Sequence, residues 1–148
     1  MEEDGPVLRV LLGSGGIATE ERRKLYGKLV SEHFSSCSEV LFVPYASHDH
    51  STYTERMRHF LSKAHPNLVG IEAKEDSIAA IRSAEAIYVG GGNSFLLIRE
   101  LHERGLIGPI REAVLSGTPY LGVSAGANVA CPTMMTTNDM PIVHPASL

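Results

Sequence analysis

The chain has 148 residues, which is the size of one ordinary domain with a real hydrophobic core. Hydrophobic residues make up 43% and charged residues 20%, a balance typical of globular proteins and not of disordered chains. The net charge of −4 predicts no surface for nucleic acid, and no apolar run is long enough to span a membrane. We therefore expect a single α/β domain over residues 1–148.

The first ten residues, MEEDGPVLRV, are acidic where a signal peptide would be basic, so the sequence favours a cytoplasmic protein. From there, short apolar runs alternate with longer amphipathic segments. The runs predicted to be strands are 7–12, 40–45, 67–72, 86–89 and 119–123. The segments predicted to be helices are 20–34, 51–65, 77–84, 94–105 and 108–117.

Several predicted helices carry boundary signals. Thr19 and Asp76 precede helices as caps, and Thr52 and Glu55 have the spacing of a capping box. Gly105 is in the usual position after a last helical turn. Alternation of strands and helices is typical of a mostly parallel, doubly wound sheet with helices on both faces.

The pentapeptide GVSAG places Ser124 where the last predicted strand gives way to a helix. It fits G-x-S-x-G, the nucleophile-elbow pattern, in the context that this pattern requires. Gly122 and Gly126 have no side chains to clash across the sharp turn, and the Ala125 N–H would face an oxyanion formed beside the serine. The alternative is a small-residue corner with an incidental serine. The pentapeptide alone does not decide between them.

A second glycine-rich stretch, VGGGNSF, also follows a predicted strand. Three consecutive glycines let a ligand approach the backbone and leave N–H groups pointing outward. The dinucleotide pattern G-x-G-x-x-G is not met. Because Gly92 and Ser124 both lie at carboxyl ends of parallel strands, one loop would supply an oxyanion donor to the nucleophile of the other. A plain glycine turn is the alternative.

Three stretches, VLFVPYAS, AIYVGGGNSFLLIRELHERGL and YLGVSAGANVACPTMMTTNDMPIV, together resemble the aspartyl dipeptidase (peptidase E) family of serine peptidases. The fold of that family is related to the class I glutamine amidotransferases. The resemblance implies hydrolysis of dipeptides with an N-terminal L-aspartate, in the cytoplasm, without a metal or other cofactor. It implies that Ser124 is the nucleophile and that Gly91, Gly92 and Ala125 supply the oxyanion donors.

The sequence departs from the family pattern in its catalytic base. In the family, the triad histidine and its acidic partner come from segments after NDMPIV, and this chain ends soon after that motif. The resemblance thus implies the N-terminal two-thirds of the catalytic domain, with the C-terminal part missing. A serine hydroxyl is a poor nucleophile without a base, so we expect this chain to be inactive alone. His144 is the nearest histidine in sequence, but geometry and not proximity sets that role.

Other polar residues are weaker candidates. Asn93 would bind the substrate or cap the helix that follows it, and Asp139 would pair with the substrate's ammonium group or act as a turn residue. His48 and His50, in the stretch SHDH, favour a solvated loop over a metal site, because a metal site needs a third ligand and residues that orient the ligands. Cys37 and Cys131 lack metal-ligand spacing and are expected to be free thiols.

Two rival interpretations stay open at this point. One is a related serine hydrolase that acts on another acidic amide. The other is a non-catalytic, truncated or regulatory product on the same scaffold. In either case, an uncovered core or sheet edge would favour self-association.

Overall fold

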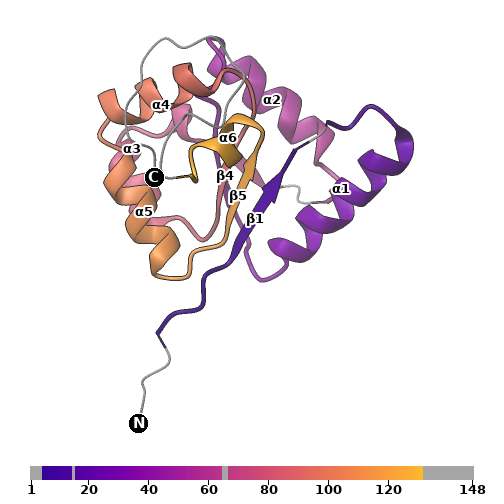
Figure 1. The fold of residues 1–148 in the computed structure, drawn as a ribbon, viewed down its shortest axis with the longest axis horizontal. Helices are drawn as coiled ribbons and strands as arrows, with labels where there is room; N and C mark the ends of the chain where they lie inside the picture. Colours follow the sequence, from indigo (N-terminus) through magenta and orange to yellow (C-terminus); the bar gives the residue numbers. More distant parts are fainter. Residues whose placement is uncertain (1–4, 15, 65–66, 132–148) are drawn as a thin grey trace.

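Five parallel strands form the sheet at the centre of the protein. The computed structural model describes residues 5–14, 16–64 and 67–131. The strands are β1 (Val10–Gly13), β2 (Val40–Val43), β3 (Leu68–Gly70), β4 (Ile87–Val89) and β5 (Tyr120–Val123). Their order across the sheet is β1-β5-β4-β2-β3, and every pairing is parallel (Figure 1). The predicted parallel α/β architecture is thus confirmed.

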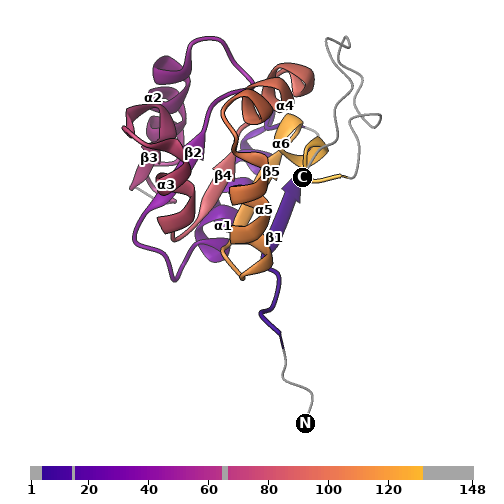
Figure 2. The ribbon, with the colours of Figure 1, turned by 90° about the vertical axis from the view of Figure 1, so that its left-hand side faces the viewer.

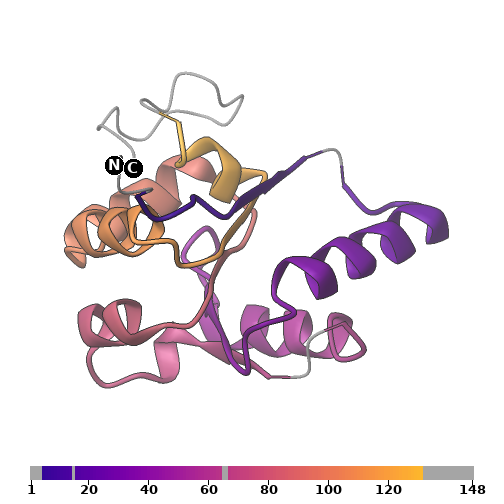
Figure 3. The same cartoon turned by 90° about the horizontal axis from the view of Figure 1, so that it is seen from below.

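Helices cover both faces of this sheet. They are α1 (Glu20–His33), α2 (His50–Phe60), the 3-10 turn η1 (Ile71–Ala73), α3 (Ser77–Ser83), α4 (Ser94–Glu103), α5 (Ile107–Leu115) and α6 (Ala125–Asn128). Figure 3 shows α1 and α2 on one side of the sheet and α3, α4 and α5 on the other. The core accordingly divides into two apolar clusters, one on each face.

The amino-acid pattern explains why the sheet is buried. All four residues of β2 and all three of β4 are buried, as expected for strands covered on both faces. Phe42 and Tyr88 point toward α1 and α2, whereas Leu41 and Val89 belong to the opposite cluster. This alternation along neighbouring strands fixes the register of the sheet, because a slip of one residue would exchange the two faces.

Four described helices, α1 to α4, begin at capping side chains. The Thr19 hydroxyl accepts from the Arg22 amide at 3.2 Å, and Asp76 accepts from the Ala79 amide at 3.0 Å, as the sequence predicts. The prediction for the second helix was wrong, because α2 begins at His50 and its cap is Asp49 instead of Thr52. Asp49 directly precedes the first turn of α2, and its carboxylate accepts a hydrogen bond from the Thr52 amide at 3.2 Å.

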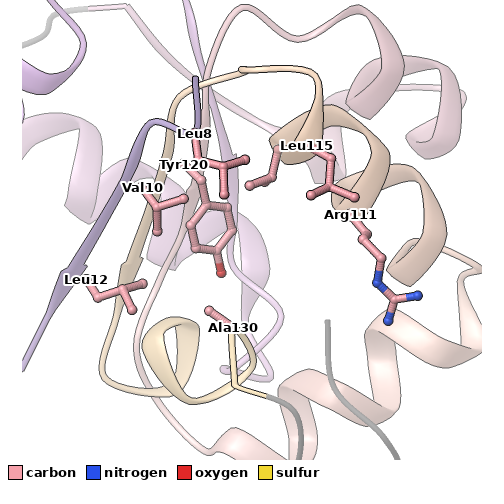
Figure 4. A pocket seen from close by; sticks show the side chains of 8 residues that line it. Leu8, Val10, Leu12, Arg111, Leu115, Tyr120 and Ala130 are labelled. Carbon is pink, nitrogen blue, oxygen red and sulfur yellow. The ribbon is translucent and has the colours of Figure 1, made fainter. Parts of the chain in front are cut away.

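An apolar groove lies beside β1, at the edge of the sheet. It has a volume of about 370 Å³ and is lined by Leu8, Val10, Leu12, Arg111, Val114, Leu115, Tyr120 and Ala130. Figure 4 shows Val10 and Leu12 from β1 and Leu115 from α5 around the Tyr120 ring. Val10 and Leu12 stay 42% and 49% exposed, so this part of the sheet face is only partly covered by the described residues.

None of the helices in the described part of the chain combines the length and the apolarity that crossing a membrane requires.

Candidate active site

Ser124 occupies a strained turn between β5 and α6. Its φ of +54° and ψ of −106° make it the one non-glycine residue with positive φ among those that the structure describes. Such a backbone conformation costs on the order of 1–3 kcal/mol and is typical of functional sites. The turn is held by the Ser124 amide, which donates to the Gly13 carbonyl at 2.8 Å, and by the Ser124 carbonyl, which accepts from Ala127 and Asn128. The serine itself is exposed.

The two glycines of the elbow are required by close backbone contacts. A Cβ on Gly122 would overlap the Gly126 carbonyl oxygen, and one on Gly126 would overlap the Val89 carbonyl oxygen. The Tyr120 hydroxyl donates to that same Gly126 carbonyl at 2.7 Å. The sequence pattern therefore has the physical cause that was predicted, since α6 crosses β4 and β5 too closely for side chains.

The glycine loop after β4 is fixed at both ends and open in the middle. The Gly90 amide donates to Val43 O at 3.1 Å, and the Asn93 amide donates to Ala46 O at 3.0 Å. Between them, neither the Gly91 nor the Gly92 amide has an acceptor among the residues that the structure describes. Gly92 has a φ of +144°, and a Cβ there would overlap the Ala46 backbone. The loop thus presents two consecutive amides that make no hydrogen bond to β2 or to the loop that follows it.

The glycine loop and the elbow meet at one rim of the sheet. A Cβ built on Gly91 would lie 3.2 Å from the Ser124 Cβ and 3.1 Å from the Val123 carbonyl oxygen. Behind them, α4 and α6 lie side by side (Figures 1 and 2), and Asn128 Nδ2 donates to the buried Ser94 hydroxyl at 2.9 Å. An exposed hydroxyl beside unpaired amides is the arrangement that acyl transfer needs.

This geometry agrees with comparisons to known proteins. The family model of peptidase family S51 matches residues 9–148. The chain belongs to peptidase family S51. The resemblance to the aspartyl dipeptidases that the sequence predicts is thereby confirmed.

The similar proteins of known name are longer than the matched segment. The S51 chain is 52% identical over 109 residues to "Probable alpha-aspartyl dipeptidase" of Drosophila melanogaster, covering 73% of this chain and 45% of that protein. It is 47% identical over 110 residues to "Peptidase E" of Streptomyces coelicolor, covering 74% of this chain and 45% of that protein. The chain therefore spans about half the length of the curated relatives it matches.

Solved structures show the same fold for this S51 chain. A crystal structure of a protein assigned as peptidase E from Listeria monocytogenes EGD-e superposes with a TM-score of 0.68. It is 24% identical and covers 95% of this chain and 74% of its own. A peptidase from an acI-B1 actinobacterium gives a TM-score of 0.63 at 18% identity, covering 87% and 59%.

The remaining predicted substrate-binding residues have different outcomes. The Asn93 side-chain oxygen accepts from the Leu96 amide at 2.9 Å and so caps α4, which was the structural alternative for this residue. Its amide nitrogen is the part of the side chain that would be left for a ligand. Asp139 and His144 lie outside the described residues.

The described histidines of the S51 chain show no cluster with a metal-binding arrangement. Within residues 5–14, 16–64 and 67–131, no three His, Cys, Asp or Glu side chains gather as metal ligands. In the stretch SHDH, Asp49 is used as a cap, and the His50 ring packs edge-on against Tyr45 at 4.9 Å. His33 is half-buried, and its Nε2 lies 2.8 Å from the Tyr120 carbonyl oxygen. Burial, opposed in part by this hydrogen bond, lowers the His33 pKa.

Sequence reasoning did not single out Tyr53 or the pair Asn128 and Ser94. The Tyr53 hydroxyl, from α2, donates to the Gly91 carbonyl at 2.8 Å. Both contacts join residues more than thirty positions apart in the chain. No local motif marks such contacts. The one sequence signal for them is a polar side chain on a helix face whose other residues are apolar.

Proposed function

We propose that this protein is a serine-type dipeptidase that hydrolyses dipeptides with an N-terminal L-aspartate. The observation that carries the proposal is the strained, exposed Ser124 in contact with a glycine loop whose Gly91 and Gly92 amides are unpaired among the described residues. The preference for aspartate is supported by the printed name of the Drosophila relative, an alpha-aspartyl dipeptidase. No cofactor is needed for this chemistry.

In the proposed mechanism, the Ser124 Oγ attacks the scissile carbonyl while a base takes its proton. The Gly91, Gly92 and Ala125 amides hydrogen-bond the oxyanion of the tetrahedral intermediate. The proton then passes to the leaving amine, the C–N bond breaks, and an ester on Ser124 forms. In the second half of the reaction, the base takes a proton from water as the water attacks this ester. The proton then passes to the serine oxygen, which releases aspartate and restores the hydroxyl.

Among the described residues, no hydrogen bond joins a histidine to Ser124, so the structure does not identify the base. His33 is engaged with Tyr120 O, and His50 packs on Tyr45. The family resemblance assigns the triad histidine to a segment after NDMPIV, so we propose little or no turnover by these 148 residues alone. If only the base is missing, an added base should restore part of the activity.

The test is chemical rescue of the 148-residue protein. Hydrolysis of Asp-Leu and of aspartyl-p-nitroanilide is measured with increasing imidazole, for the wild type and for Ser124→Ala. We expect a rate that rises with free imidazole in the wild type and is absent in Ser124→Ala. Equal imidazole-dependent rates in both proteins would remove Ser124 from the mechanism.

The substrate preference is tested with a panel of dipeptides. Asp-Leu, Glu-Leu, Asn-Leu and a β-aspartyl dipeptide differ in the length, charge and linkage of the acidic side chain. Equal rates on all four would contradict the aspartate preference and favour a related hydrolase for another acidic amide. We further propose that Asn93 and Asp139 contact the substrate. Asn93→Asp keeps the oxygen that caps α4, so a raised KM in that variant would report contact with the substrate carboxylate.

A non-catalytic product on the same scaffold is the second candidate function. It is favoured by one observation, that no hydrogen bond joins Ser124 to a histidine among the described residues. Intact mass of the protein from its own cells, read against its messenger sequence, distinguishes a stable short species from a longer chain. A short species that is inert toward Asp-Leu, and that a serine-directed phosphonate does not label even with imidazole, would support this candidate.

We also propose that the protein acts in the cytoplasm and associates with itself. The resemblance to the aspartyl dipeptidase family supports the first proposal. The exposed edge strand β1 and the apolar groove beside it support the second.

A further inference from the structure

Tyr53 lies in α2, on the face of the sheet opposite α4 and α6. Its ring is buried and packs edge-on against Phe42 of β2, with 5.2 Å between the ring centroids. The Arg56 guanidinium covers the ring at 5.1 Å from the centroid. Both of these contacts are made by the ring and not by the hydroxyl.

The hydroxyl nevertheless makes a specific contact with the glycine loop. It donates to the Gly91 carbonyl oxygen at 2.8 Å. A Cβ on the preceding residue, Gly90, would lie 2.7 Å from the same hydroxyl oxygen, so the backbone passes directly over it. Burial raises the Tyr53 pKa, which keeps the hydroxyl protonated and able to donate.

The direction of the Gly91 carbonyl sets the direction of the next amide. The described residues contain no cis peptide bond, and in a trans peptide the N–H points opposite to the C=O of the same plane. The hydrogen bond to Tyr53 orients the Gly91 carbonyl toward α2. The Gly92 N–H, on the opposite side of the same peptide plane, therefore points away from α2. Gly92 is exposed, and its neighbour Gly91 contacts Ser124.

We infer that Tyr53 is a positioning residue, whose hydroxyl fixes the Gly91–Gly92 peptide plane so that the Gly92 amide serves as an oxyanion donor. This inference rests on the function proposed above. A hydrogen bond is needed to fix this peptide plane, because a plane between two glycines can rotate with little steric restriction. Among the described residues, the other backbone hydrogen bonds that fix the loop are those of the Gly90 and Asn93 amides, on either side of this plane.

The test compares Tyr53→Phe with Tyr26→Phe. The first variant keeps the buried ring and removes the hydroxyl. The second removes a hydroxyl from the apolar cluster on the same face of the sheet, where Tyr26 and Tyr88 share a hydrogen bond. Within the described residues, Tyr26 makes no hydrogen bond to the glycine loop. In the imidazole-supplemented assay with aspartyl-p-nitroanilide, we expect Tyr53→Phe to lower kcat about 10- to 100-fold with little change in KM, since an oxyanion donor acts in the transition state. Tyr26→Phe should keep the wild-type kcat.

A second readout does not depend on turnover. In protein labelled with 13C and 15N at glycine, Tyr53→Phe should shift the Gly91 carbonyl and Gly92 amide resonances, whereas Tyr26→Phe should leave both in place. If wild type shows no Ser124-dependent hydrolysis, the proposed function fails, and these resonances still decide the role of Tyr53. Unchanged resonances, an unchanged kcat in Tyr53→Phe, or an equal loss of kcat in both variants would overturn the inference.

Discussion

Ser124 holds a backbone conformation that a residue with a Cβ adopts only under constraint, with φ at +54°. Glycine has no such penalty, although it loses more conformational freedom on folding. We predict that Ser124→Gly is more stable to urea than Ser124→Ala by about 1 kcal/mol, the strain released less the added entropy cost. Both variants lack the hydroxyl, so their difference reports the backbone alone. Equal midpoints of unfolding would mean that the turn is not strained.

Gly126 is expected to tolerate no side chain, in contrast to Gly27. A Cβ on Gly126 would overlap the Val89 carbonyl oxygen, a backbone atom of β4 that cannot turn aside. We predict that Gly126→Ala lowers the free energy of unfolding by about 2 kcal/mol or more. Gly27 lies within α1, and outside its own helix no atom lies within 4 Å of an added Cβ, so Gly27→Ala should be neutral or stabilising by up to about 1 kcal/mol. Urea denaturation of both proteins measures this contrast, and similar losses would contradict it.

The residues that the sequence predicts well are those whose constraint is local. Gly122, Ser124 and Gly126 belong to one turn, and five consecutive letters carry its geometry. Asn93 had two predicted roles, and only the structure shows its hydrogen bond to the Leu96 amide. Tyr53 could not be predicted, because the partner of its hydroxyl is a loop carbonyl 38 positions away.

At the level of elements, α1 is joined to the sheet by an ionisable side chain. His33 is the last residue of α1, and its Nε2 contacts the Tyr120 carbonyl of β5. Burial, with the nearby Arg9 adding to it, holds the His33 pKa below its usual value of about 6.5, so the folded state favours the neutral imidazole. The unfolded chain then binds more protons just below that pH.

The stability that His33 contributes should therefore be present above about pH 6.5 and be lost as the pH falls through the lower folded pKa. We predict that His33→Gln, which can still donate to Tyr120 O, makes the acid-side decrease in stability shallower. Urea unfolding at a series of pH values in wild type and variant measures the two slopes. Parallel slopes would show that His33 does not titrate with folding.

The order of the elements was predictable, but their ends were less so. Apolar runs predicted all five strands and amphipathic segments predicted α1 to α5, with Thr19 and Asp76 as caps. The 3-10 turn η1 was not predicted, because its first two residues continue the apolar run assigned to the third strand. The first strand was predicted over 7–12 but begins at Val10, where pairing with Tyr120 of β5 starts. An apolar run marks burial, whereas a strand also needs a neighbour to pair with, and the sequence does not show where that neighbour begins.

For the whole molecule, the sheet order explains why the two loops form one site. β4 and β5 are neighbours, so the glycine loop and the elbow leave adjacent strands at the same edge. In open parallel sheets, ligands bind at the carboxyl ends of the strands, and this rule allowed the juxtaposition to be predicted before the structure. The apolar groove beside β1 contains none of these loop residues and is a separate feature.

That groove leads to a prediction about assembly. β1 pairs only with β5 among the described strands, its other edge has no partner in that part of the chain, and Val10 and Leu12 are exposed beside it. We predict a concentration-dependent dimer that pairs two β1 edges and covers both grooves. A lysine on an edge strand opposes such pairing, so Leu12→Lys should be monomeric in sedimentation velocity. Leu25→Lys, which replaces a leucine 56% exposed on α1, is the matched control and should still dimerise. A monomeric wild type at high concentration, or equal loss in both variants, would contradict an interface at β1.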